Sequence, residues 1–393
     1  MQPPAKSYLQ RLAPDGEKRM LSLDGGGIRG LITIEILARL EELLRAELAA
    51  GPEFVLGDYF DYVAGTSTGA IIATAIALGY SVDEIRSFYL SGTRAMLRRA
   101  SIFKQFYYRN VDTAIIARLR EVLCRPDGAE RTLGDVDLRT LLLLVIRNAT
   151  TNSPWPLSNN PDAKYNDRSH PGCNLDLPLW KIVRASTAAP TYFPPQDLTV
   201  GPEEFLFVDG AVSVYNNPAF KLFIMATIPE YRLCWPTGED KMLLVSIGTG
   251  MVRGGTPKLR ASQMTLLYNA RSVPSALLDA ALHDQDLLCR AFGRCTFGAT
   301  VDSEVGDMRS RDAISPRSAS LRSEPKKFTY VRYNPELSEK GLEDLELAGI
   351  RPEDVQPLDS AAHLPELTAI GQAYARKFVD LTHFGPFPLG TAR

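Results

Sequence analysis

The sequence has few of the residues that build disulfide frameworks, zinc sites or basic surfaces. Its 393 residues include only five cysteines, an odd number with wide spacing and no CxxC pair. We therefore predict reduced thiols in a cytoplasmic protein, without a disulfide framework or a zinc site. The formal net charge is −2, so the chain lacks the overall basic charge of proteins that bind nucleic-acid polymers.

Long apolar runs are also missing. No run reaches the roughly 20 apolar residues that a transmembrane helix requires, and residues 141–146 predict a short buried strand instead. The opening of the chain has no apolar core of a signal peptide, and residues 1–17 predict a loose polar arm. We therefore expect a cytoplasmic protein that meets any membrane lipid from the water side.

Strand-like and helix-like stretches alternate along residues 18–250. Strands are predicted at residues 18–23, 62–64, 140–148, 205–208 and 242–247, and helices at 31–50, 70–78, 81–99, 113–123 and 179–188. Residues 150–174 are rich in Asn, Pro, Ser and Asp, which predicts a long surface loop. The alternation is typical of an α/β fold, in which helices cover both faces of a mostly parallel sheet.

The residues after 250 predict a mainly helical C-terminal extension. Two helices within 261–292 are expected to separate near Pro274, followed by a strand at 328–333 and a closing helix at 364–381. The chain then divides into an arm (1–17), a core (18–250) and an extension (251–393) for which regulation is a hypothesis. A basic loop at 309–327 is either simply solvated or holds an anionic lipid surface or a nucleotide phosphate.

The stretch Gly65-Thr66-Ser67-Thr68-Gly69 joins an apolar strand to an apolar helix. Gly65 and Gly69 let the strand and the helix approach in a sharp turn that exposes the Ser67 hydroxyl. Ser67 then lies at a helix N-terminus, where unpaired N–H groups favour negative charge. The pattern indicates a nucleophilic serine, and a glycine-rich turn with an incidental serine is the alternative.

A second glycine loop, DGGGIRG at residues 24–30, directly follows the first predicted strand. Bare N–H groups of Gly25, Gly26 and Gly27 at a helix start can hold a phosphate, or the oxyanion that forms when a hydroxyl attacks an ester. We predict an oxyanion hole, with Arg29 orienting or neutralising nearby charge. A purely structural turn is the alternative.

The same loop formally fits the GxGxxG pattern of dinucleotide-binding proteins through Gly25, Gly27 and Gly30. That pattern requires an acidic residue at the end of the next strand, about 20 residues on. Here the next predicted strand lies farther along the chain and leads to Ser67. A nucleotide site is therefore the weaker interpretation of the loop.

A serine hydroxyl needs a positioned base before it becomes a good nucleophile. None of the four histidines directly follows a predicted strand with a glycine turn, whereas Asp209 does, just before Gly210. Burial beside Ser67 raises the pKa of such a carboxyl above its usual value near 4. Because sites in these sheets lie beyond the carboxyl ends of strands, we expect Gly25, Ser67 and Asp209 to meet in one pocket.

Taken in order, these motifs resemble the patatin-like phospholipases. The resemblance rests on DGGGIRG (24–30), GTSTG (65–69), RASTAAP (184–190), DGA (209–211), NNP (216–218) and SIGTG (246–250). It covers about residues 18–250. One departure is Ala211, where the family often has a glycine.

The resemblance implies a Ser–Asp dyad with Ser67 as nucleophile and Asp209 as base. It also implies an oxyanion hole made by the amides of Gly25 to Gly27. Four further glycines support these motifs: Gly30, Gly65, Gly69 and Gly210. The implied activity is hydrolysis of acyl esters in glycerophospholipids at a membrane surface, through an acyl-enzyme and without a metal or other cofactor.

The core followed by an extension also resembles bacterial phospholipase effectors that cyclic nucleotides switch on in phage defence. The activator implied is a cyclic nucleotide. Two other interpretations stay open. One is an α/β-hydrolase with a Ser67–Asp209–His283 triad, whose chain order fits, and the other is a nucleotide-binding protein that uses the glycine loop without hydrolysis.

Overall fold

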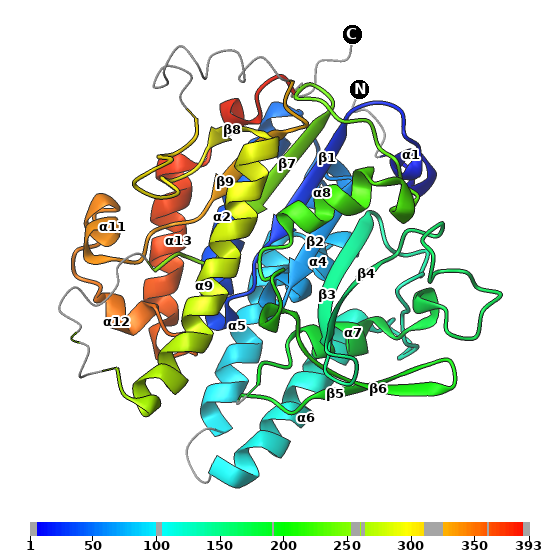
Figure 1. The fold of residues 1–393 in the computed structure, drawn as a ribbon, viewed down its shortest axis with the longest axis horizontal. Coiled ribbons are helices and arrows are strands. Elements are labelled where there is room, and N and C mark those ends of the chain that lie inside the picture. Colours follow the sequence, from blue (N-terminus) through cyan, green and yellow to red (C-terminus); the bar gives the residue numbers. More distant parts are fainter. Residues whose placement is uncertain are drawn as a thin grey trace.

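In the computed structural model, residues 6–99, 104–190, 192–252, 260, 264–309, 325–359 and 361–387 are described. Their nine strands form one sheet in the order β5-β6-β3-β2-β1-β7-β9-β8, with β4 paired to β3 (Figure 1). The strands are β1 (Lys18–Leu23), β2 (Tyr62–Thr66), β3 (Leu141–Asn148), β4 (Ser153–Ser158), β5 (Gln196–Val200), β6 (Glu203–Asp209), β7 (Met242–Ile247), β8 (Arg294–Phe297) and β9 (Thr329–Tyr333).

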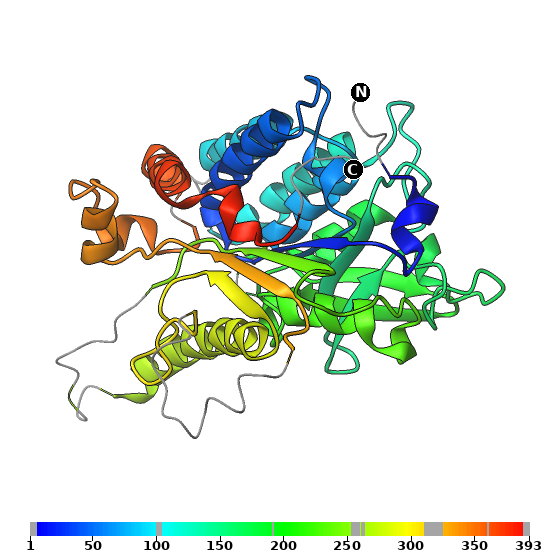
Figure 2. The ribbon, with the colours of Figure 1, turned by 90° about the horizontal axis from the view of Figure 1, so that it is seen from above.

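Helices cover both faces of this sheet. They are α1 (Tyr8–Leu12), α2 (Gly30–Glu47), α3 (Leu56–Tyr59), α4 (Thr68–Ala77), α5 (Val82–Arg99), α6 (Lys104–Leu123), α7 (Leu179–Ser186), α8 (Ala219–Thr227), α9 (Leu266–Phe292), α11 (Glu339–Asp344), α12 (Pro352–Val355) and α13 (Leu364–Phe378). Seen along the sheet in Figure 2, α2 and α13 lie on one side of the strands and α9 on the other. The predicted α/β fold with a mostly parallel sheet and a helical C-terminal region is confirmed.

Side chains of the central strands alternate between two apolar cores. In β1, Leu21 and Leu23 belong to the core that includes α2, α4 and α13, whereas Met20 belongs to the core that includes α8. All three side chains are fully buried. Such strands read as continuous apolar runs because both faces of the sheet are covered. This explains why β1, β2, β3 and β7 were recognisable in the sequence.

Strands β2 and β6 lie end to end along β3. β2 runs parallel to β3 and ends at Thr66, opposite Val145. β6 runs antiparallel to β3 and ends at Asp209, opposite Ile146. Since β4 occupies the other edge of β3 over Leu143–Asn148, both strands pair along the same edge of β3. Their carboxyl ends therefore face each other.

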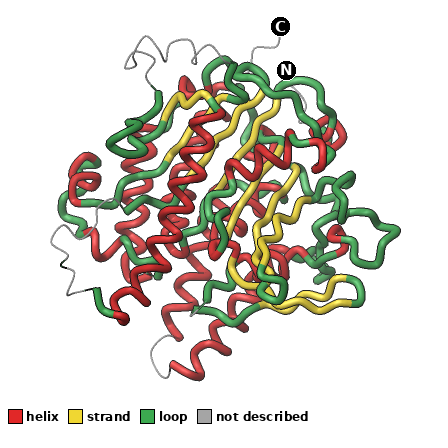
Figure 3. The backbone as a smooth tube through the Cα atoms, in the orientation of Figure 1, coloured by secondary structure: helices red, strands yellow, loops and turns green. Residues whose placement is uncertain are grey.

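In this region, one prediction is wrong and the bounds of another are too short. Residues 150–174 are not one long loop, because β4 lies within them and pairs with β3. Pro154 and Pro156 favour a loop in the sequence, because proline has no backbone N–H. Two residues apart, both prolines lack an N–H on the same edge of the strand, and a strand at the edge of a sheet tolerates this loss. The strand at residues 205–208 is longer than predicted, and it extends outward in the β5–β6 hairpin (Figure 3).

Two more corrections concern helices and the N-terminal arm. Pro274 does not separate two helices, because α9 continues through it from Leu266 to Phe292. A proline inside a helix removes one hydrogen bond and does not always end the helix. Residues 6–17 are not loose either, since α1 is anchored by Arg11, a 1% exposed side chain that donates to the carbonyl of Gly57 (2.9 Å).

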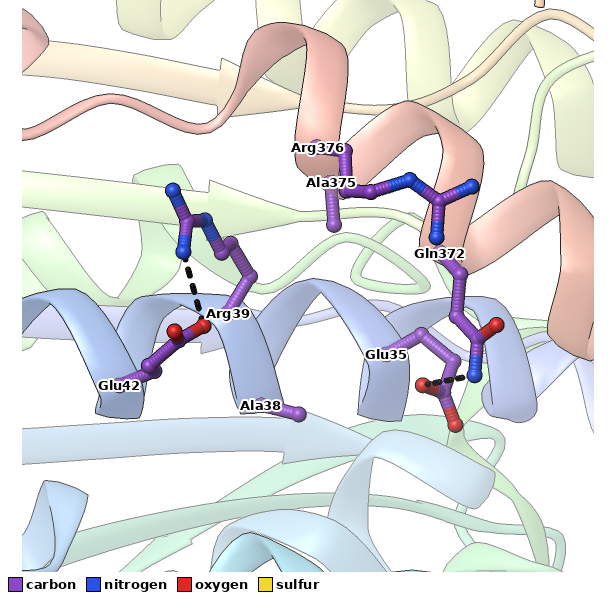
Figure 4. A pocket seen from close by; sticks show the side chains of 7 residues that line it. All are labelled: Glu35, Ala38, Arg39, Glu42, Gln372, Ala375 and Arg376. Atoms are coloured by element: carbon purple, nitrogen blue, oxygen red, sulfur yellow. Dashed lines mark hydrogen bonds and ion pairs between the residues drawn. The ribbon is translucent and has the colours of Figure 1, made fainter.

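The residues after 250 extend the sheet of the core. β9 pairs in parallel with β7, and β8 pairs in parallel with β9. Helix α13 packs against α2, and Gln372 donates to Glu35 (Figure 4). Glu35 also accepts from Arg86 of α5. The basic loop 309–327 lies mostly outside the described residues. No helix in the described ranges is long and apolar enough to cross a membrane.

Helix α4 packs directly over the end of β1 at Gly69. A Cβ added there would lie 2.3 Å from the carbonyl oxygen of Leu23 and 2.8 Å from that of Asp24. Backbone atoms cannot yield as a flexible side chain does. This contact therefore requires glycine.

We expect Gly69→Ala to lower the free energy of unfolding by about 1–3 kcal/mol, because it overpacks a rigid contact. Gly349→Ala is the matched control, since its added Cβ meets nothing within 4 Å. Urea unfolding followed by circular dichroism measures both variants. Equal stability of Gly69→Ala and the control would contradict the predicted contact.

Candidate active site

Ser67 occupies a sharp turn between β2 and α4. Its backbone has φ 54° and ψ −124°, an unusual conformation for a residue with a side chain. The Ser67 amide donates to Ser186 Oγ (2.9 Å), and that hydroxyl donates to the carbonyl of Val145 (2.7 Å). Ser186 of α7 thus holds the strained turn against β3.

The Ser67 hydroxyl contacts Asp209 directly. Ser67 Oγ donates to Asp209 Oδ2 over 2.7 Å, and the amide of Ala211 donates to Asp209 Oδ1 over 2.7 Å. The Asp209 side chain is 2% exposed. Because both carboxylate oxygens are held, one of them is aimed at the hydroxyl.

Burial raises the pKa of Asp209 from 3.8 to about 7. The hydrogen bonds from Ala211 and Ser67 and the charge of Arg184 act in the opposite direction, but burial is the larger effect. A carboxylate with this pKa accepts a proton near neutral pH far more readily than an exposed one. The Asp209 carboxyl group therefore gains and loses its proton near neutral pH.

No histidine in the described part of the chain bonds to either member of this pair. The imidazole of His283 lies on α9, with Nε2 3.8 Å from Asp302 Oδ2. His383 contacts the hydroxyl of Tyr333, and His363 contacts Glu366. The geometry of a Ser67–Asp209–His283 triad is thus absent among these residues.

The glycine loop lies beside Ser67, but its amides differ in their partners. The Gly25 amide donates to the carbonyl of Asn216 (3.0 Å). The amides of Gly26 and Gly27 have no hydrogen-bond partner among the described residues. Of the three predicted donors, Gly25 is therefore engaged elsewhere, and the donors open to an anion are Gly26 and Gly27.

Arg29 was predicted to orient or neutralise charge at the site, but no hydrogen bond joins it to Ser67 or Asp209 among the described residues. Its amide donates to the carbonyl of Gly26 (3.2 Å), and its guanidinium donates to the carbonyl of Gln356 (3.2 Å). Burial lowers the pKa of Arg29 to about 10, although Asp279 and Asp24 counteract this effect. The arginine links the glycine loop to the C-terminal part of the chain.

Tyr89 of α5 connects the two glycine-rich turns. Its hydroxyl donates to the carbonyl of Gly27 and contacts Thr68 Oγ1 (2.8 Å). On the other side of the same peptide, the Ile28 amide donates to the carbonyl of Leu358 (2.9 Å). Both ends of the peptide between Gly27 and Ile28 are therefore held.

The four supporting glycines lie at close contacts between parts of the site. A Cβ added to each would lie too close to a neighbouring atom: Thr68 Oγ1 for Gly30 (2.6 Å), the Gly69 carbonyl for Gly65 (2.1 Å), the Leu23 carbonyl for Gly69 (2.3 Å) and the Val145 carbonyl for Gly210 (2.2 Å). Ala211 does not have a positive φ, so the backbone at this position does not require the glycine that the family often has.

Three residues that contact the Ser67 turn or the glycine loop were not assigned a role from the sequence: Ser186, Asn216 and Tyr89. Ser186 and Asn216 belong to the RASTAAP and NNP motifs, so their positions were visible but their partners were not. Tyr89 lies on an ordinary amphipathic helix and carries no sequence signal. Each acts through a contact distant in the chain, which a local pattern does not reveal.

The chain has sequence similarity to proteins named as phospholipases or patatin-like proteins. It is 32% identical over 237 residues to cGAMP-activated phospholipase of Escherichia coli (strain TW11681), which covers 59% of this chain and 62% of that protein. It is 32% identical over 258 residues to Patatin-like protein 1 of Arabidopsis thaliana, covering 60% of this chain and 59% of that protein. The match thus spans about three fifths of these curated relatives.

Among solved structures, VipD from Legionella pneumophila matches with a TM-score of 0.34 and 13% identity, over 90% of this chain and 67% of that one. The sequence model of the family described as patatin-like phospholipase matches residues 21–223. These residues make up just over half of the chain. The protein therefore belongs to the patatin-like phospholipase family.

Proposed function

We propose that this protein cleaves acyl esters of glycerophospholipids through a Ser67–Asp209 dyad. Membership of the patatin-like phospholipase family supports activity as a lipid acyl hydrolase. The observation that carries the dyad is the direct 2.7 Å hydrogen bond from Ser67 Oγ to the buried Asp209 carboxylate. A directly bonded base needs no histidine as relay.

In the first step, Ser67 Oγ attacks the ester carbonyl carbon while Asp209 Oδ2 takes the hydroxyl proton. The carbonyl oxygen gains negative charge, and the amides of Gly26 and Gly27 are the donors proposed to stabilise it. Collapse of this intermediate breaks the bond to the leaving alcohol, which receives the proton from Asp209. An acyl-Ser67 ester and a lysophospholipid result.

In the second step, water attacks the acyl ester with Asp209 again as base. The same amides stabilise the second oxyanion, and Ser67 leaves as it regains a proton. The products are a fatty acid and the original enzyme. The strained turn held by Ser186 keeps Ser67 Oγ in one position throughout, and such positioning contributes to rate.

We also propose that a cyclic nucleotide activates the enzyme, that it acts from the cytoplasm on a membrane surface, and that it serves in antiphage defence. The support is the similarity to relatives named cGAMP-activated phospholipase in Escherichia coli and Vibrio cholerae. Residues after 250 are the proposed regulatory part, since Gln356 and Leu358 contact the glycine loop.

Substitutions in the dyad test the reaction. We expect Ser67→Ala to reduce fatty-acid release from mixed phospholipid vesicles by about 10³-fold or more. Asp209→Asn removes the base and should reduce release by about 10²–10⁴-fold, because it removes general-base catalysis. His283→Ala is the control and should keep activity within about twofold.

Full activity of Ser67→Ala would contradict the proposed function and favour a protein that binds nucleotide without hydrolysis. Loss of activity in His283→Ala would favour the Ser67–Asp209–His283 triad, in which Asp209→Asn is also expected to lose activity. Circular dichroism of each variant confirms that it is folded. Fatty acid is quantified by mass spectrometry.

The ionisation of Asp209 predicts the pH dependence. Because the ionised carboxylate is the base and its pKa is raised to about 7, kcat/KM should rise with pH through about 7 and then level off. A short soluble ester avoids effects of pH on vesicles. A rate that stays constant down to about pH 5 would mean that no group with this raised pKa acts as base.

Cyclic-nucleotide activation predicts binding that calorimetry can measure. Titration of cyclic di- and trinucleotides into the full chain should give saturable heat with at least one of them, and the same nucleotide should increase fatty-acid release. Ser67→Ala should bind it equally well, which separates binding from hydrolysis. No heat from any of these nucleotides would remove the activation proposal and leave the hydrolase proposal intact.

A further inference from the structure

A buried ion pair joins the glycine loop to the C-terminal part of the chain. Asp24, the first residue after β1, accepts two hydrogen bonds from the guanidinium of Arg332 in β9: Nη1 to Oδ1 over 2.9 Å and Nη2 to Oδ2 over 2.5 Å. The two side chains are 2% and 3% exposed. A guanidinium matches a carboxylate in this bidentate geometry, which an ammonium group does not reproduce.

The register of the sheet explains how Arg332 reaches Asp24. Ser22 of β1 lies opposite Ser246 of β7, and Ser246 lies opposite Arg332 of β9. The small Ser246 side chain leaves room for the arginine to cross β7, and its hydroxyl accepts a third hydrogen bond from Arg332 (2.7 Å). Burial disfavours the arginine's charge, but Asp24 outweighs this effect and raises the pKa of Arg332.

Asp24 stands at the start of the segment that contains the amides of Gly26 and Gly27. Its own amide donates to the carbonyl of Ile247 (3.1 Å), and the carbonyl of Gly25 accepts from Thr249 Oγ1 (3.2 Å). With the Arg332 pair, Asp24 is held at both backbone and side chain. The next residues, Gly26 and Gly27, have amides without a partner among the described residues.

We propose that Arg332 is a positioning residue for the oxyanion hole, acting through Asp24 to fix the amides of Gly26 and Gly27. The inference rests on the proposed ester hydrolysis at Ser67. Arg332 lies outside residues 21–223, which match the family model. The C-terminal part of the chain thus contributes to the geometry of the reaction centre as well as to any regulation.

Arg332→Lys tests this role, because lysine keeps the charge but loses the bidentate fork. We expect kcat on a short soluble ester to fall about 10–100-fold with KM unchanged, since misplaced donors weaken transition-state stabilisation and not substrate binding. The rise of kcat/KM with pH should keep its midpoint, because Asp209 is untouched. Because unfolded protein also lowers the apparent kcat without changing KM, kcat is calculated per folded molecule, with the folded fraction measured by circular dichroism.

Arg11→Lys is the matched control. Arg11 is equally buried and binds the carbonyls of Phe60 and Gly57 and the carboxylate of Asp61, near the amino end of β2. It should lower stability without lowering kcat of the folded protein. The double variant Asp24→Asn with Arg332→Gln removes both charges, leaves no unpaired buried ion, and should also show reduced kcat.

Normal kcat in folded Arg332→Lys or in the double variant would overturn the positioning role. An equal fall of kcat in Arg11→Lys would do the same, since the effect would then be general. Ser67→Ala is measured in parallel. Activity that does not require Ser67 would refute the proposed hydrolysis, whereas Ser67-dependent activity with normal kcat in Arg332→Lys would refute only the role of Arg332.

Discussion

The site depends on one buried hydrogen bond between the ends of two strands. Ser67 follows β2 and Asp209 ends β6, and the two strands meet along the same edge of β3. A residue added or removed near either end would shift the hydroxyl or the carboxylate to the other face of its strand. The antiparallel hairpin β5–β6 thus helps to form the candidate site, since it directs Asp209 back toward the parallel strands.

Burial affects the Asp209 carboxyl group and the polar groups around it in different ways. It raises the pKa of Asp209 to about 7 and so makes the carboxylate a usable base. Burial also removes water as a partner, so nearby polar groups must bond within the protein. Ser186, Tyr89 and Asn216 meet this need, and they leave the Gly26 and Gly27 amides without a partner in the described residues.

Much of this arrangement could be predicted from the sequence. Fully buried strands produce apolar runs, and sharp turns require glycine, so β1, β2 and the turn around Ser67 were recognisable. Asp209 was identified because it follows a strand and precedes a glycine. The roles of Ser67 and Asp209 in the reaction stay predictions.

The incorrect predictions have a common physical cause: contacts between distant parts of the chain determine the structure at these positions. The Gly25 amide and the Arg29 guanidinium were predicted to serve the oxyanion hole, but Asn216 and Gln356 accept their hydrogen bonds. Likewise, the two prolines of β4 favour a loop in the sequence, but in the structure these residues form a strand that pairs with β3. The Asp24–Arg332 pair spans distant parts of the chain, and no local pattern marks it.

The most direct test of the account is a crystal structure of the protein with Ser67 phosphonylated by a fluorophosphonate ester. The adduct mimics the charged intermediate. We predict its phosphonyl oxygen about 2.7–3.1 Å from the amides of Gly26 and Gly27, with Asp209 beside Ser67 Oγ. A phosphonyl oxygen bound by other donors, or an imidazole beside Ser67 in place of the Asp209 carboxylate, would contradict the account.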